Sequence, residues 1–112
     1  GEQRRVGAAL VLAQQAPLAL LDEPTNHLDP AHALGLLEVF AAHARGGGAT
    51  IATLHDPTLA ARFATHALLL HGDGRWQHGT ADELLHAEAL SAIYLTPINE
   101  LQAAGRRLFY AQ

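Results

Sequence analysis

Residues 18–29 read Leu-Ala-Leu-Leu-Asp-Glu-Pro-Thr-Asn-His-Leu-Asp, and this stretch decides the fold class of the chain. Its four leading apolar residues are typical of a short strand that is buried on both faces. Pro24 ends the strand, so Asp22 and Glu23 stand at its carboxyl end. Open α/β sheets bind their ligands at that edge. One carboxylate there can hold a magnesium ion, and a second can orient or deprotonate an attacking water.

An isolated Asp-Glu pair is more often only the polar start of a loop, but the complete string is far more specific than the pair. It resembles the Walker B segment and the following D-loop of ATP-binding-cassette (ABC) ATPases. The resemblance places Asp22 at the magnesium-binding position and Glu23 at the catalytic position. It also places Asp29 in a loop that the family uses at its dimer interface. Asp29 followed by Pro30 is, in addition, a typical helix start.

Two flanking segments resemble other motifs of the same family, in the family's order. Residues 1–5, Gly-Glu-Gln-Arg-Arg, are similar to the tail of the signature motif. The resemblance implies that Gly1 and Glu2 open a helix whose amino end contacts ATP held by a partner subunit. Thr53-Leu54-His55-Asp56 resembles the switch-histidine segment, so His55 is expected to contact the γ-phosphate. ATP and Mg²⁺ are the implied cofactors, with Asp22 as the metal ligand.

The composition limits the classes of function that the chain can have. With 112 residues, of which 49% are hydrophobic, it can form one small domain or part of a larger one. A net charge of −4 argues against a nucleic-acid partner. All seven basic residues are arginine, so the chain lacks the lysine that a phosphate-binding loop requires. Methionine is absent, and the chain opens inside a motif. We therefore expect the C-terminal part of a longer protein.

The spacing of apolar, capping and turn residues predicts alternating helices and strands. The expected helices cover residues 3–15, 30–45, 57–64 and one or two segments after residue 80, and the expected strands cover 49–54, 67–71, 75–78 and 107–110. The predicted fold class is α/β, a P-loop NTPase-like parallel sheet with flanking helices, incomplete because only the C-terminal half of an ABC nucleotide-binding domain is present. Residues 1–71 would carry the motif core, and residues 72–112 would form a hairpin and an α+β tail.

The segment around the switch histidine favours one branch of the family. Leu54-His55-Asp56 followed by residues 59–64 looks like the ATPase subunits of iron-siderophore, haem and vitamin B12 importers, and residues 79–85 agree. Pro57-Thr58 departs from that group. The resemblance implies a dimer with a second nucleotide-binding subunit, transmembrane permease partners and a peripheral place on the cytoplasmic face of the inner membrane. The alternatives are a soluble, translation-associated ABC factor and a non-catalytic fragment. The isolated chain is expected to be inactive.

Overall fold

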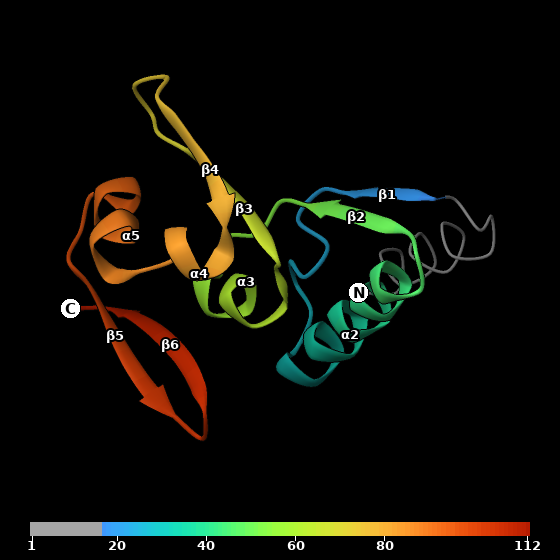
Figure 1. Cartoon of the computed structure of the whole chain (residues 1–112). Helices are drawn as coiled ribbons and strands as arrows, with labels where there is room; N and C mark the ends of the chain where they lie inside the picture. Colours follow the sequence, from blue (N-terminus) through green and yellow to red (C-terminus); the bar gives the residue numbers. More distant parts are fainter. Residues whose placement is uncertain (1–16) are drawn as a thin grey trace. The chain divides into compact units, whose positions relative to one another are not determined.

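The computed structural model describes residues 17–112. These residues form ten helices and strands, whose arrangement within each part of the chain can be followed in Figure 1. The predicted helix over residues 3–15 lies outside the described residues, as do Gly1 and Glu2. In chain order the elements are β1 (Leu18–Leu21), α2 (Pro30–Arg45), β2 (Ala49–Ala52), α3 (Pro57–Phe63), β3 (His66–Leu70), β4 (Trp76–Thr80), α4 (Ala81–Leu84), α5 (Ala87–Tyr94), β5 (Ile98–Ala103) and β6 (Arg106–Ala111). The chain divides into two units, one ending at His55 and one that begins at Asp56.

In the first unit, β1 and β2 form a parallel pair joined by α2. Local signals in the sequence set both ends of that helix. The carboxylate of Asp29 accepts a hydrogen bond from the backbone N–H of His32 at 2.9 Å, and Pro30 fills the first helical position. Gly47, with φ of 103°, turns the chain out of the helix in a conformation that only glycine adopts easily. The predicted helix and its boundaries are confirmed.

The core of this unit lies between α2 and one face of the parallel pair. Ala19 is 1% exposed and Phe40 is 3% exposed, and Leu21 and Leu36 pack against them. Side chains on the opposite face of the pair are largely exposed, as Leu20 illustrates at 69%. The expectation that this strand is buried on both faces is therefore wrong for the described residues. Side chains alternate between the faces of a strand, and α2 covers one face only.

The second unit contains two hairpins and three short helices around a separate core. The antiparallel pairing of β3 with β4 confirms the predicted hairpin, with Leu69 opposite Gln77. Thr80 caps α4 by accepting a hydrogen bond from the backbone N–H of Glu83 at 3.2 Å, as its capping-box spacing predicts. The core consists of four buried residues from this hairpin, α4, α5 and the link between the helices: Leu69, Ala81, Leu85 and Leu90.

The C-terminal hairpin is larger than the sequence pattern indicates. The predicted last strand is confirmed as β6, but its partner β5 is not evident in the sequence. Ala104 and Gly105 connect the two strands, and both have positive φ, at 52° and 73°. The backbone N–H of Phe109 donates to the Thr58 hydroxyl at 2.9 Å, which connects β6 to α3.

Among residues 17–112, none of the helices has the length and apolar character that a membrane span requires.

Candidate functional site

The two acids and the histidine that the sequence singles out lie together where the parallel strands end. Asp22 and Glu23 follow β1 directly, and His55 comes three residues after β2. The backbone N–H of Thr53 donates to the Leu21 carbonyl at 3.0 Å, so the parallel pairing continues one step beyond β2. This brings the His55 Nε2 atom into contact with the Glu23 Oε1 atom. The side chains that the resemblance places at the nucleotide are thus adjacent in the folded chain.

Glu23 adopts a backbone conformation that is unusual for a residue with a side chain. Its φ of 47° lies in the left-handed region, which costs a non-glycine residue roughly 1–2 kcal/mol. A tight turn follows, in which the Asn26 N–H donates to the Glu23 carbonyl at 3.1 Å. The Asn26 side chain reaches back as well, since its Nδ2 atom donates to Glu23 Oε2 at 2.5 Å. Asn26 and His55 thus contact the two different oxygens of this carboxylate.

The Thr53 hydroxyl connects the two acids to the second strand. It donates to the Asp22 Oδ1 atom and accepts the backbone N–H of Glu23, each at 2.7 Å. The sequence pattern marks Thr53 only as the first residue of the switch-histidine segment, and Asn26 only as part of the motif string. Because hydrogen bonds between residues 30 or 31 positions apart depend on strand pairing, spacing along the chain cannot reveal them.

Asp29 stands at the far end of the loop that Glu23 begins, and its carboxylate caps α2. The backbone N–H of His32 holds the pKa of Asp29 below its ordinary value of 3.8, and the His32 ring, with Nδ1 2.7 Å from Oδ2, acts in the same direction. The structure therefore gives Asp29 the helix-capping role that the Asp-Pro pair predicts. Its place at a dimer interface stays a prediction.

The donor atoms at this edge fit a magnesium ion that is also bound by phosphates. Mg²⁺ prefers hard oxygen ligands and usually takes one or two carboxylates together with waters and phosphate oxygens. Asp22 supplies one exposed carboxylate, and its Oδ1 atom is already oriented by the Thr53 hydroxyl. Across residues 17–112, no cluster of three or more histidine, cysteine or acidic side chains could hold a metal ion alone. Asp22 can therefore supply one of the one or two carboxylates that Mg²⁺ usually takes.

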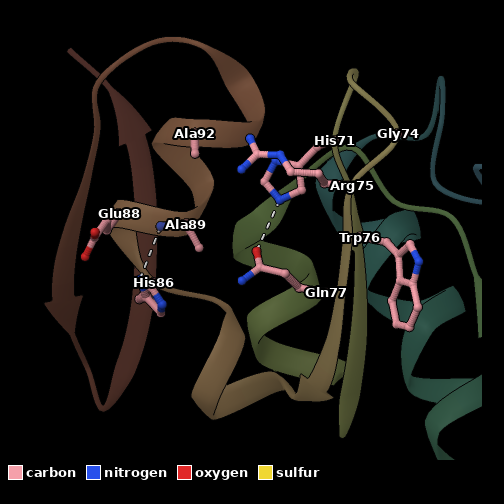
Figure 2. Close-up of a pocket in the computed structure, with 9 residues that line it drawn as sticks. All are labelled: His71, Gly74, Arg75, Trp76, Gln77, His86, Glu88, Ala89 and Ala92. Carbon is pink, nitrogen blue, oxygen red and sulfur yellow. Dashed lines mark hydrogen bonds between the residues drawn. The ribbon is translucent and has the colours of Figure 1, made fainter.

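A shallow groove in the second unit lies between the β3–β4 hairpin and α5 (Figure 2). His71, Arg75 and Gln77 lie on the side of the hairpin that faces α5, whereas Trp76 lies on the other side. Several polar groups of the groove already have partners. Arg75 pairs with Asp73 at 2.7 Å, and the His71 Nε2 atom lies 3.1 Å from the Gln77 Oε1 atom. The groove contains none of the three residues predicted to act on a nucleotide.

Curated proteins with similar sequences are ATP-binding proteins of bacterial importers. The chain is 42% identical over 98 residues to the hemin import ATP-binding protein HmuV of Streptomyces coelicolor, covering 88% of this chain and 35% of that protein. It is 39% identical over 95 residues to the ferric enterobactin transport ATP-binding protein FepC of Escherichia coli, covering 84% and 35%. The chain thus spans about a third of the length of these relatives. No model of a protein family matches it.

A comparison with solved structures finds one with a fold similar to that of this chain. One chain, described as belonging to a metal-chelate type ABC transporter in an inward-facing conformation, superimposes with a TM-score of 0.87 at 24% identity. That match covers 99% of this chain and 46% of the other. Because these curated relatives are 39–42% identical to the chain over more than four fifths of its length, the chain belongs to the ABC family of ATPases. Within that family, it resembles the ATPase subunits of haem and siderophore importers.

Proposed function

We propose that the chain is the C-terminal portion of a single ABC nucleotide-binding domain, which hydrolyses ATP to drive the uptake of a solute. The observation that carries this proposal is the cluster at the end of the parallel pair. It sets the Glu23 carboxylate beside Asp22 and His55, in contact with the histidine ring. The names of the relatives favour haem or an iron-siderophore as the solute class. The sequence resemblance adds cobalamin as a third candidate solute.

The chemistry assigned to each residue follows from its atoms. Asp22 would hold Mg²⁺ directly or through a water, and the ion would neutralise charge on the phosphates. Glu23 would orient the attacking water and accept its proton. His55 stands beside Glu23 and can present a ring N–H to a phosphate oxygen. Gly1 and Glu2 would begin the helix that contacts ATP on the partner subunit, and Asp29 would lie in the loop at that dimer interface.

The proposed partners are a second nucleotide-binding subunit and transmembrane permease subunits, which would hold the protein at the cytoplasmic face of the inner membrane. The isolated 112-residue chain should neither bind Mg-ATP tightly nor hydrolyse it, because it has no lysine to contact the β- and γ-phosphates. Calorimetry with Mg-ATP and a phosphate-release assay test this. Micromolar binding or clear turnover by the isolated chain would contradict it.

The transport role can be tested in cells that lack the gene. The full-length protein should restore growth with haem or a ferric siderophore as the sole iron source, and it should co-purify with a membrane permease. A Glu23→Gln variant, expressed at the same level, should co-purify equally well but fail to restore growth. Co-sedimentation with ribosomes, together with normal iron uptake in the deletion strain, would instead favour the translation-associated alternative.

A further inference from the structure

We propose that Thr53 is a positioning residue that fixes the geometry of both Walker B acids through its hydroxyl group. The inference rests on the proposed ATPase function and adds to it a residue outside the expected catalytic set. Thr53 is suited to the role because its own backbone is anchored, with its N–H donating to the Leu21 carbonyl at 3.0 Å. Its side chain is therefore held at a fixed place beside the end of β1.

The hydroxyl uses both of its hydrogen-bonding capacities on the acids. As a donor it orients the Asp22 carboxylate, and as an acceptor it receives the Glu23 backbone N–H, both at 2.7 Å. A hydroxyl can donate one hydrogen bond while accepting others, so the two contacts are compatible. The residue thereby connects the proposed metal ligand, the proposed general base and the neighbouring strand through one oxygen atom.

The contact to the Glu23 N–H matters because the backbone of Glu23 is strained. A residue with positive φ persists in that conformation only when its surroundings hold it there. At Glu23 the Thr53 hydroxyl binds the backbone N–H, and Asn26 binds the side chain. Without the hydroxyl, Glu23 would lose the hydrogen bond to its backbone N–H and keep only the bond from the Asn26 N–H to its carbonyl. Its carboxylate would then sample positions away from the His55 ring.

Three substitutions in the full-length ATPase separate the hydroxyl from the shape of the side chain. Thr53→Val keeps the branched shape and removes the hydroxyl, whereas Thr53→Ser keeps the hydroxyl and removes a methyl group. Thr50→Val is the matched control on β2, because the buried Thr50 hydroxyl has no hydrogen-bond partner. If Thr53→Val does not fold, Thr53→Cys replaces it, since a thiol is a poor donor and acceptor.

We expect Thr53→Val to lower kcat for ATP by about 10- to 100-fold, as is typical when a partner of a metal-binding residue is lost. KM for ATP should change by less than about threefold, because Thr53 is not assigned a contact with the nucleotide. Thr53→Ser and Thr50→Val should stay within about threefold of the parent kcat. A structural role for the side chain alone predicts the reverse order, with the valine variant active and the serine variant impaired.

A second readout needs no nucleotide. In the free protein, amide hydrogen exchange at Glu23 should be roughly threefold to tenfold faster in Thr53→Val than in the parent, Thr53→Ser and Thr50→Val. Unchanged exchange and unchanged kcat in Thr53→Val, with Glu23→Gln inactive, would overturn the role of Thr53 while leaving the ATPase proposal intact. A parent protein without Mg-dependent ATPase activity would overturn both.

Discussion

Phe40 holds α2 against the strand that carries the two acids, so its replacement should destabilise the full-length protein. The side chain is 3% exposed and packs with Ala19, which is 1% exposed, at the centre of the first unit. Phe40→Ala removes the largest side chain of this small core. Since Asp22 and Glu23 directly follow β1, the substitution weakens the packing of α2 against the strand that positions them.

The size of the effect follows from the burial of Phe40. Replacing a buried phenylalanine with alanine costs about 3–5 kcal/mol. The lower end applies here, because Leu21 and Leu36 are only partly buried and can relax into the space. For a protein of 150–250 residues, 1 kcal/mol corresponds to about 2–4 °C in Tm. A loss of about 3 kcal/mol therefore predicts a Tm lower by roughly 6–12 °C.

Urea unfolding followed by circular dichroism measures the change, with differential scanning fluorimetry for Tm. Val39→Ala is the matched control, since Val39 neighbours Phe40 on α2 but is 45% exposed. The control should stay within about 0.5 kcal/mol of the parent. If Phe40→Ala unfolds at the parent's urea midpoint, or no earlier than Val39→Ala, then α2 does not support the strand as described.

The remaining predictions concern the switch histidine, a helix cap and a strained residue. His55→Ala should slow ATP turnover while sparing ATP affinity, because its proposed phosphate contact matters most as charge develops; equal losses of affinity and rate in a steady-state and binding assay would contradict this. Asp29 has a lowered pKa in the folded state, so its stabilising effect is complete above pH 3.8 and is lost as pH falls through the lowered value. Carboxylates titrate between about pH 5 and pH 2, and Tm should fall less steeply over this range in Asp29→Asn than in the parent. An unchanged decline of Tm would argue against the capping role. Leu95 is 89% exposed and has φ of 55°, a conformation that glycine adopts more easily. Leu95→Gly should therefore raise the free energy of unfolding in urea by about 0.5–1 kcal/mol. A lower free energy of unfolding would show that the Leu95 side chain stabilises the fold.

The ends of the helices could be predicted from the sequence because their causes are local. Asp29 and Asp56 each accept a backbone N–H from a residue two or three positions ahead, and proline follows each of them. Thr80 does the same for Glu83. Such contacts need no knowledge of the rest of the fold, so spacing alone identifies them. The boundaries of α2 and α3 follow directly.

Features that depend on distant residues could not be predicted in the same way. The apolar run over residues 18–21 indicates that a strand has faces to bury, but it does not say which element covers each face. The strand β5 has no regular alternation of apolar and polar residues, and it is recognised only by its pairing with β6. The connecting Ala-Gly turn is not among the strong hairpin signals such as Asn-Gly.

The candidate site shows the same division between local and distant causes. The motif string identifies Asp22 and Glu23, and the order of the strands implies that His55 lies near them. The roles of Thr53 and Asn26 emerge only from distances in the folded chain. Their polar side chains occur too widely at strand ends and in loops to be informative without those distances.

The assignment of Glu23 as general base is tested most directly by single-turnover hydrolysis of Mg-ATP with the Glu23→Gln variant of the full-length protein. The amide keeps the size of the carboxylate but cannot accept a proton from water. We predict that ATP binding is retained, that hydrolysis falls by about 10²–10⁴-fold, and that the variant accumulates as an ATP-bound dimer in size-exclusion chromatography. Hydrolysis at the parent rate by a monomeric Glu23→Gln protein would contradict the assignment of Glu23 as general base.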